Sequence, residues 1–464
     1  MQSENTLKIK KNDLYTVTIE DLGSDGAGIG KVDGYTLFIK DALIGDVAEV
    51  KVIKTKKHYG YARLMRMITP SPDRVEAPCP VARSCGGCQI QPLSYEKQLA
   101  FKQRKVEELL TRVGHVSDYA MHPMIGMEEP WHYRNKAQYP VGRDREGRIT
   151  MGFYAGRTHS VIDCRDCAIG RPVNGRILER VQQWMEENRI APYDEGSGRG
   201  LVRHILIREG FHTGQIMVCL IINGKKLPHQ QALIGALAEI PGMTSLSYSV
   251  NTADTNVILG ESAVTIWGQP YITDMIGDVK YQISPMSFYQ VNPVQTEKLY
   301  RTALDFADPG PEDVIWDLYC GIGTISLFLA QKAAKVCGVE IIPEAIADAK
   351  RNAALNGMAG VDFYVGKAEE VLPEKYAKEQ IRADIIVVDP PRKGCDRALL
   401  DCIGQMQPKK VVYVSCDPAT LARDLAILQE KGYKVTDVRC CDMFPHTVHV
   451  ETCALLTKAS VSEA

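Results

Sequence analysis

The sequence predicts an α/β protein in three parts: an N-terminal β-barrel, a central α+β domain and a Rossmann-like C-terminal domain. With 464 residues, the chain is too long for one compact core. Short β-branched runs alternate with glycine-rich turns over residues 13–66, which indicates a small barrel. From residue 311 onward, strand-like and helix-like segments alternate, which indicates a parallel sheet with helices on both faces. We therefore expect domains at 1–72, 73–282 and 283–464.

The composition is that of a globular protein from a reducing compartment. Apolar residues make up 45% and charged residues 24%, and the net charge of −2 gives no overall attraction to nucleic acid. No run approaches the roughly 18 apolar residues of a membrane helix. The start, MQSENTLKIKK, lacks the apolar segment of a secretion signal. We expect a cytoplasmic monomer without membrane contact, whose 14 cysteines are thiols, catalytic groups or metal ligands.

The predicted barrel carries a basic and aromatic stretch. No acidic residue occurs from Lys51 to Pro72, and six cations surround Tyr59 and Tyr61. Such a mixture suits a surface that follows a nucleic-acid backbone and stacks on its bases. A solvated strand face with exposed charges is the alternative.

The central part begins after the proline-rich break TPSPDRVEAPCP. We expect helices over residues 94–113 and 174–189, and strands over 204–210 and 214–224. The segment WHYRNKAQYPVGR, residues 131–143, adds cations and aromatics that suit an RNA surface, although ordinary strand packing produces the same pattern.

Five strands are expected in the C-terminal domain, at VIWDLYCG, AKVCGVE, VDFYVG, ADIIVVDPP and KKVVYVSC. The helix-like segments between them predict parallel pairing. The last two apolar runs, residues 433–444 and 449–458, are separated by only PHTV, so we expect them to pair antiparallel.

The turn DLYCGIGT after the first of these strands indicates a cofactor site. Its glycines allow close approach of a ligand, and the following helix presents its N–H groups. Glu340 ends the second strand, where an acidic residue holds ribose hydroxyls in nucleotide-type folds. Ser326 stands where a dinucleotide fingerprint has its third glycine, so S-adenosylmethionine, which has no pyrophosphate, fits better. Asp389, in VDPPRKG, is expected at the same sheet edge unless it is only a helix cap.

Cys416 ends the fifth strand at that edge, and Asp417 and Pro418 predict a helix directly after it. A helix dipole favours a thiolate at this position, although most buried cysteines only fill the core. In a methyltransferase, thiolate addition to C6 of a pyrimidine makes C5 nucleophilic enough to take a methyl group. A base must then remove the C5 proton, and Glu451 at the start of the last strand is the best candidate.

The motifs SFYQVNP, DLYCGIGT, VDPPRKG, VYVSCDPATLARD and HVET resemble, in order and spacing, those of the RNA uracil-5-methyltransferase family, which modifies tRNA and large-subunit rRNA. The resemblance covers nearly the whole chain and implies a class I methyltransferase domain with an RNA-binding TRAM-type, OB-like barrel. It implies that Cys416 is the nucleophile and Glu451 the base. Thr324 departs from the family pattern, which often has Asn there. The remaining contacts that the resemblance implies are Gln290, Tyr319, Glu340 and Asp389 for the cofactor and Phe288 for the target base.

Further cysteines lie in CPVARSCGGC and DCRDCAIG, some 75 residues apart, which is far beyond a zinc-ribbon spacing. Thiolates also suit an iron-sulfur cluster, and the C-x5-C-x2-C spacing differs from that of radical enzymes. In the resembled family this spacing holds a 4Fe-4S cluster, for which Cys167 matches the fourth ligand better than Cys164. The resemblance thus implies a structural cluster on Cys79, Cys85, Cys88 and Cys167; zinc and free thiols are the alternatives.

The expected substrate is RNA with an accessible uridine. Attack at C6 needs the face of the ring, so the base must lie in a loop or be flipped out. Members of the resembled family act on the tRNA T-loop or on large-subunit rRNA, and the cluster and barrel favour 23S rRNA. Two rival hypotheses stay open. One is methylation of an exocyclic amine, for which Asp-Pro-Pro usually continues with an aromatic where Arg392 stands. The other is a non-catalytic RNA-binding or ribosome-assembly factor.

Overall fold

The computed structural model describes residues 9–156 and 158–459. The chain divides into two compact units. The first comprises Met1–Lys102, Ala155–Thr158 and Phe444–Val448, and the second comprises Gln103–Tyr154, His159–Met443 and His449–Ala464. Each β-sheet lies within one unit, and the division into three domains at 72/73 and 282/283 stays a prediction.

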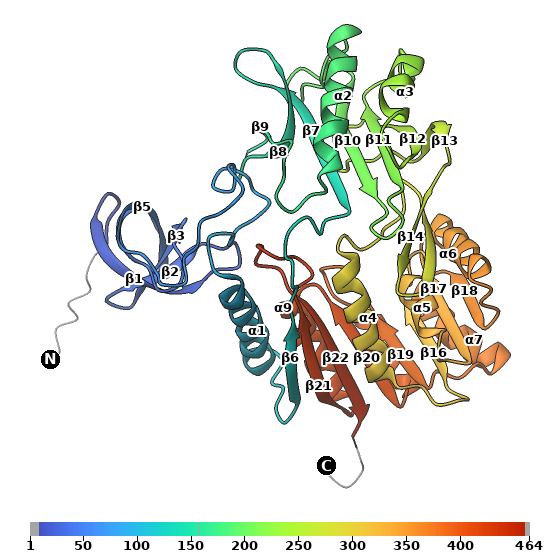
Figure 1. Ribbon diagram of the computed structural model, residues 1–464. Helices are drawn as coiled ribbons and strands as arrows, with labels where there is room; N and C mark the ends of the chain where they lie inside the picture. The colour runs from blue at the N-terminus through green and yellow to red at the C-terminus, as the bar shows by residue number, and fades with distance from the viewer. Residues whose placement is uncertain (1–8, 157, 460–464) are drawn as a thin grey trace, which may run out of the picture. The chain divides into compact units, whose positions relative to one another are not determined.

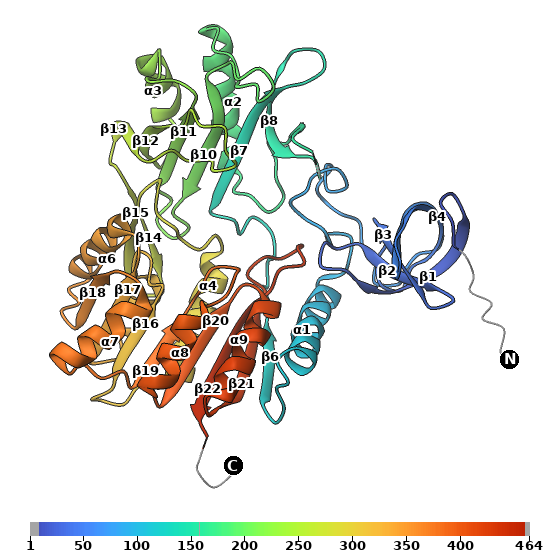
Figure 2. The same cartoon turned by 180° about the vertical axis from the view of Figure 1, so that it is seen from behind.

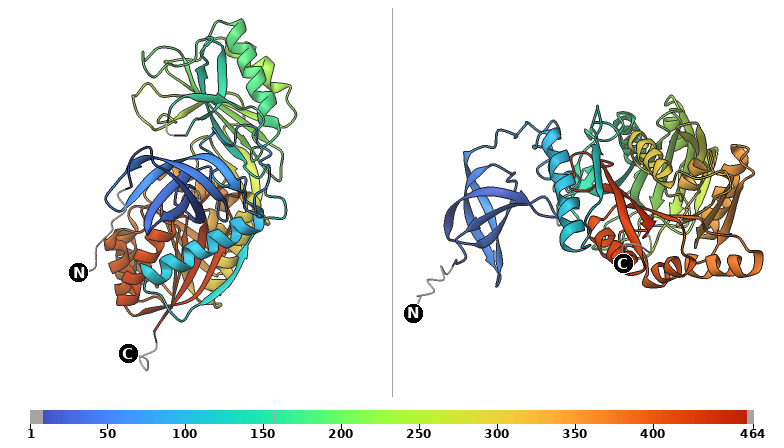
Figure 3. Two further views of the ribbon diagram at one scale, coloured as in Figure 1. Left: turned by 90° about the vertical axis from the view of Figure 1, so that its left-hand side faces the viewer. Right: turned by 90° about the horizontal axis from the view of Figure 1, so that it is seen from below.

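The first unit contains a closed barrel, coloured blue in Figure 3. Its strands are β1 (Leu14–Leu22), β2 (Gly28–Val32), β3 (Tyr35–Lys40), β4 (Val47–Thr55) and β5 (Tyr59–Thr69). They close in the order β1-β2-β3-β5-β4. Alternate residues such as Val17, Ile19, Leu37 and Ile39 are almost fully buried inside, as the period of two in a strand requires. The predicted barrel is confirmed.

A short chain segment from near the C-terminus also belongs to the first unit. The carbonyl of His446 accepts hydrogen bonds from Gln89 N and Ile90 N, both at 3.1 Å. Lys102 Nζ donates to the carbonyl of Phe444 at 3.0 Å, and the side chain of Val448 lies in the same apolar cluster as Leu93. Residues 444–448 therefore pack within the first unit, although they connect two consecutive strands of a sheet in the second unit.

The central part of the chain forms a seven-stranded sheet in the second unit. Its strands are β7 (Lys136–Arg143), β8 (Ile149–Tyr154), β9 (Val161–Asp163), β10 (Val202–Glu209), β11 (Ile216–Ile222), β12 (Met243–Val250) and β13 (Ala263–Gly268), in the order β13-β12-β11-β10-β7-β8-β9. Helices α2 (Val173–Glu187) and α3 (Gln230–Ala238) share one apolar core with it, which includes Trp184 and Leu237. The hairpin β14 (Ile272–Ile276) and β15 (Val279–Ile283) follows.

The larger sheet of the second unit has eight strands. They are β6 (Ala120–Ile125), β16 (Val314–Leu318), β17 (Lys335–Glu340), β18 (Val361–Val365), β19 (Ile385–Val388), β20 (Lys410–Ser415), β21 (Tyr433–Cys441) and β22 (Glu451–Lys458), in the order β18-β17-β16-β19-β20-β22-β21-β6. The pairs among β16 to β20 are parallel, whereas β22 is antiparallel to both β20 and β21. The predicted parallel sheet and antiparallel closing pair are confirmed. Strand β6, which comes from the stretch we expected in the central domain, pairs with β21 at the edge.

Helices cover both faces of this sheet. They are α4 (Pro293–Ala307), α5 (Thr324–Leu329), α6 (Pro343–Leu355), α7 (Ala368–Glu379), α8 (Arg397–Met406) and α9 (Pro418–Glu430), and α1 (Tyr95–Arg112) precedes β6. Figure 1 shows α4 in front of one face, and Figure 2 shows α7, α8 and α9 on the opposite face. Central strands such as β19 are buried along their whole length, because both faces are covered. Within residues 9–156 and 158–459, no helix is long and apolar enough to cross a membrane.

Candidate active site

Cys416 lies between the end of β20 and the start of α9. Asp417 has an extended backbone, and its side chain accepts hydrogen bonds from Ala419 N at 2.9 Å and Thr420 N at 3.2 Å. Pro418 occupies the first helical turn, where no N–H donor is needed. The predicted helix start after Cys416 is confirmed, and the cap fixes the backbone that carries the thiol.

The pKa of the Cys416 thiol differs from the expectation. Burial raises this pKa to about 12, and the carboxyl groups of Glu451 and Asp389 add to the rise, whereas Arg392 lowers it. The expectation that the helix dipole favours the thiolate is therefore wrong for the protein alone, because burial and two carboxyl groups outweigh the dipole. A reacting partner or an added positive charge must stabilise the anion before it can attack.

The low thiolate content can be tested directly. We expect alkylation of Cys416 by iodoacetamide to be slow at pH 7 and to accelerate roughly tenfold per pH unit up to pH 9, because the thiolate fraction rises tenfold per unit below the pKa. Tryptic mass spectrometry after timed quenching gives the rate at this site. A rate that is already maximal at pH 7 would contradict the raised pKa.

Glu451 begins β22, opposite Cys441 of β21. Glu451 is buried, with only 2% of its surface exposed. Burial raises the pKa of Glu451, and the charge of Asp389 raises it further, whereas Arg392 lowers it. A carboxyl group with a raised pKa is a stronger base than an exposed glutamate, which suits proton removal near neutral pH.

Asp389 follows β19 and completes this group of titratable side chains. Burial raises its pKa, and the charge of Asp317 adds to the effect. Asp389 influences the pKa values of both Cys416 and Glu451. The structure thus brings together three predicted site residues that are distant in the sequence.

The loop that carries Asp389 is attached to the first turns of α9. Thr420 Oγ1 donates to the carbonyl of Arg392 at 3.2 Å, and Cys395 N donates to the buried carboxylate of Asp424 at 2.8 Å. Gly394 has φ +78°, and a Cβ there would meet Asp424 Oδ2 at 2.6 Å, so glycine is needed at this position. These contacts fix the end of VDPPRKG relative to the helix that follows Cys416.

Arg392 is a site residue whose role could not be predicted from the sequence, where it only stands at a position that is usually aromatic in amine methyltransferases. In the structure, its charge lowers the pKa values of both Cys416 and Glu451. Its position two residues after Pro390, in a loop at the carboxyl edge of the sheet, was the available signal.

The turn after β16 forms the other side of this edge. The buried carboxylate of Asp317 accepts a hydrogen bond from Ser326 Oγ at 2.5 Å, which explains the serine where a dinucleotide site has glycine. Glu340 accepts from Gly321 N at 3.3 Å and Ile342 N at 3.1 Å. Tyr319 adopts a positive φ of 81°, a strained conformation for a tyrosine that is typical of functional turns.

Residues 287–292 place two more predicted residues. Asn135 Nδ2 donates to the carbonyl of Gln290 at 3.0 Å, and Asn135 N donates to the carbonyl of Val291 at 2.9 Å. Gln290 is buried, whereas Phe288 is 67% exposed. A large exposed aromatic on an anchored loop is available for stacking on a ligand.

The segment 131–143 is only partly the exposed basic surface that we considered. Tyr133 and Tyr139 are core residues, as the alternative of strand packing requires. Lys136 faces Arg208 across the β7–β10 pair, and burial together with the charges of Arg208 and Arg134 lowers its pKa to about 7. Arg208 Nη2 donates to the carbonyl of Ser287 at 2.5 Å, so these cations adjoin the loop that carries Phe288.

The predicted metal ligands are divided between the two units. Cys79, Cys85 and Cys88 belong to the first unit, and Cys167 belongs to the second. Gly87 N donates to Cys85 Sγ at 3.3 Å. A hydrogen bond with Cys164 and the N–H groups of Ile169 and Gly170 lower the pKa of Cys167 to about 6. In the part of the chain that the structure describes, no three Cys, His, Asp or Glu side chains form a group ready to hold a metal ion.

Comparisons with known proteins agree with this architecture. The family model described as tRNA (Uracil-5-)-methyltransferase matches residues 269–459, and the TRAM domain model matches residues 10–65. A protein of Halalkalibacterium halodurans, described as an uncharacterized RNA methyltransferase, is 54% identical over 455 residues, which cover 98% of this chain and 99% of the relative. A Clostridium tetani protein with the same description is 48% identical over 97% of this chain and 98% of its own length.

A solved structure also matches over nearly the full length. The Pyrococcus abyssi tRNA (uracil-54, C5)-methyltransferase in complex with S-adenosyl-L-homocysteine has a TM-score of 0.77 and 28% identity, covering 95% of this chain and 99% of that one. The two family models cover the barrel and most of the C-terminal sheet, and the two relatives cover the rest. The chain therefore belongs to the RNA uracil-5-methyltransferase family and is an RNA methyltransferase with an N-terminal TRAM domain.

Proposed function

We propose that this enzyme methylates C5 of an accessible uridine in RNA, with Cys416 as the nucleophile and Glu451 as the base. The observation that carries the proposal is that Glu451 and Asp389 both act electrostatically on Cys416, and Asp389 on Glu451, at one sheet edge. A thiol beside a buried carboxyl group of raised pKa supplies both groups that addition and elimination require. An amine methyltransferase would need neither.

S-adenosylmethionine is the proposed methyl donor, and the residues after β16 and β17 suit it. A Cβ at Gly321 would meet no atom within 4 Å, so space lies over the turn. Glu340 is half-buried and is followed by Ile341 and Ile342, which are 59% and 52% exposed. A carboxylate for ribose hydroxyls beside apolar side chains for a base fits an adenosyl group. We assign Gln290, Tyr319, Glu340 and Asp389 to cofactor binding.

The chain's own groups would then act in sequence. Cys416 Sγ loses its proton to solvent and forms a bond to C6 of uracil, which places the electron pair on C5 and its conjugated carbonyl. After C5 has taken the methyl group, Glu451 removes the C5 proton. The C5=C6 double bond reforms as the S–C6 bond breaks, which releases Cys416 as a thiolate. Phe288 is positioned to stack on the target base.

Two surfaces support RNA as the macromolecular partner. On the barrel, Phe38, Tyr59 and Tyr61 have ring centroids 5.7 to 5.9 Å apart, beside the exposed cations Lys54 and Lys56. In the second unit, the half-buried Arg134 has no carboxylate partner among the described residues. Clustered aromatic rings and unpaired cations suit RNA bases and phosphates.

We propose 23S rRNA as the substrate, because the TRAM domain and the cysteine set resemble those of the rRNA-modifying members. The deciding experiment is tritium release from RNA labelled at uracil C5, with unmodified rRNA and tRNA assayed separately, with and without S-adenosylmethionine. Cofactor-dependent release from rRNA is expected. Release from tRNA alone would contradict the choice of rRNA, and release from neither RNA would contradict C5 methylation.

We also propose that Cys79, Cys85, Cys88 and Cys167 hold a 4Fe-4S cluster. The N–H donors toward Cys85 and Cys167 support this, because cluster sulfurs accept such hydrogen bonds. Protein purified without oxygen is expected to contain about four iron and four sulfide per chain and to absorb near the visible wavelengths typical of such clusters. Cys85→Ser should lose most of the iron, whereas Cys164→Ser should retain it. Equimolar zinc without iron would contradict the assignment.

A further inference from the structure

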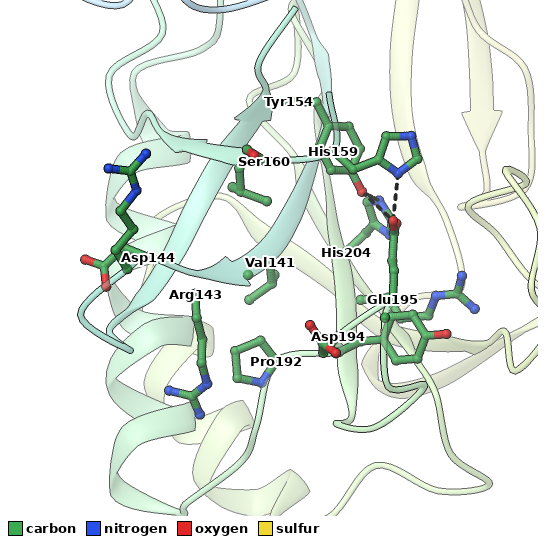
Figure 4. A pocket seen from close by; sticks show the side chains of 16 residues that line it. Val141, Arg143, Asp144, Tyr154, His159, Ser160, Pro192, Asp194, Glu195 and His204 are labelled. Atoms are coloured by element: carbon green, nitrogen blue, oxygen red, sulfur yellow. Dashed lines mark hydrogen bonds and ion pairs between the residues drawn. The ribbon is translucent and has the colours of Figure 1, made fainter. Parts of the chain in front are cut away.

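A cavity of about 580 Å³ lies in the central part of the second unit, apart from the residues assigned to catalysis. It is lined by residues of β7, β8, β9, the turn 192–196 and the start of β10. Figure 4 shows Arg143 and Asp144 on one side, and Tyr154, His159, His204 and Glu195 on the other. The volume is within the range of ligand pockets, and none of these residues has a role in the proposed reaction.

One side of the cavity is aromatic. The rings of Tyr154 and His159 have centroids 5.2 Å apart and planes inclined by 30°. Glu195 holds them in place, because its carboxylate lies 2.6 Å from His159 Nδ1 and accepts a longer hydrogen bond from Tyr154 Oη at 3.5 Å. Tyr193 adds a ring, over which the guanidinium of Arg203 lies at 4.5 Å from the centroid. Rings fixed in this way present flat surfaces to a heteroaromatic ligand.

His204 adds a buried hydrogen-bonding group to that side. Its Nε2 lies 3.4 Å from Tyr154 Oη, and its Nδ1 has no hydrogen-bond partner among the described residues. Burial and the charge of Arg203 lower the pKa of His204 to about 4, so the imidazole is neutral at pH 7. In the tautomer that lets Tyr154 donate to Glu195, Nε2 donates to Tyr154 and Nδ1 remains an acceptor.

The other side of the cavity is cationic. Asp144 is paired with Arg148 at 2.7 Å, which leaves Arg143 and Arg145 without a carboxylate among the described residues. Arg143 Nη1 donates only to the carbonyl of Gly147 at 2.5 Å. Guanidinium groups of this kind bind phosphate well. A bare anion would also meet Glu195 and Asp194, so the lining fits a ligand with a phosphate at one end and a base at the other.

We propose that this cavity binds an unstacked nucleotide of the RNA substrate other than the methylated uridine. The base stacks on the tyrosine and histidine side, and its phosphate contacts Arg143 or Arg145. Such a contact would select an RNA loop by a second extruded base, in addition to the uridine at Cys416. This inference rests on the proposed action on RNA.

The test fills the cavity without touching the reaction site. A Cβ at Gly196 would meet only Asp194 Oδ1, at an ordinary 3.6 Å, so Gly196→Trp places an indole at the cavity without backbone strain. Gly235→Trp, on the exposed surface of α3 where a Cβ meets nothing within 4 Å, is the matched control. Binding of labelled total rRNA and of S-adenosylmethionine is measured for both variants and the wild type. Arg145→Ala is a second variant that keeps the fold unperturbed.

We expect Gly196→Trp to weaken rRNA binding about tenfold or more, as the loss of one stacked base does. Its affinity for S-adenosylmethionine should be unchanged. Gly235→Trp should bind both rRNA and S-adenosylmethionine as the wild type does. Ultraviolet crosslinking of the wild type should attach a nucleotide other than the methylated uridine to the peptide of Tyr154 or Tyr193. Affinity within twofold of wild type for both cavity variants would overturn the inference, as would a crosslink of the methylated uridine itself. If the wild type neither binds nor methylates RNA, the proposed function itself is contradicted. If the wild type is active and the cavity variants bind RNA equally well, only the inference about the cavity is contradicted.

Discussion

Replacing Cys416 by alanine is expected to reduce C5 methylation by more than about a thousandfold while RNA and S-adenosylmethionine still bind. Without a sulfur to add at C6, C5 of uracil is too weak a nucleophile, and the second group, Glu451, has no adduct from which to remove a proton. The measurement is tritium release from C5-labelled RNA under single-turnover conditions, with binding constants for both substrates measured in parallel.

The matched control is Cys402→Ala, a buried cysteine of α8 with no proposed role. It is expected to lower the free energy of unfolding by about 1 kcal/mol and to leave the methylation rate close to wild type. Full activity of Cys416→Ala would mean that methyl transfer needs no covalent step, and the exocyclic-amine mechanism would then become the leading explanation.

Replacing Glu451 by glutamine is expected to stop the reaction after methyl transfer. The amide keeps the shape of the side chain but cannot accept the C5 proton, so the S–C6 bond to Cys416 persists. Turnover should fall about 10²- to 10⁴-fold, and a protein–RNA adduct that carries the new methyl group should accumulate on denaturing gels. The double variant with Cys416→Ala should form no adduct.

The pH dependence gives a separate check on Glu451. Its pKa is raised by burial and by Asp389, and only the ionised form can take a proton. Turnover of the wild type is therefore expected to fall as the pH drops through this raised pKa, well above the ordinary range of glutamate. A turnover rate that stays constant down to pH 5 would show that proton removal by Glu451 does not limit the reaction.

The sheet that carries the active site could be predicted because its strands are continuous apolar runs ended by turn residues. Such runs are typical of strands covered on both faces, and β16, β17, β19 and β20 lie where they were expected. Strand β6 could not be predicted. It contains Pro123, and its partner β21 is more than 300 residues away, so no local pattern marks the pairing.

The electrostatics of the site were less predictable than its location. The helix start at Asp417 is a local feature and was correct. The pKa of Cys416 depends instead on Glu451, Asp389 and Arg392, which come from two other chain segments. A dipole argument based on neighbours in the sequence omits those charges and the burial that the complete sheet imposes. The burial of Lys136 could not be predicted for the same reason, because it lies beside Arg208 of β10, which is distant in the sequence.

The segment 444–448 has a consequence for building chimeras within this family. It is built into the unit that holds the barrel, yet Val448 stands only three residues before Glu451. An exchange of N-terminal modules that cuts the chain once, after residue 102, would separate His446 and Phe444 from the residues 89–102 that bind them. A working graft must therefore take two discontinuous pieces from the same parent, the N-terminal module and this short insert.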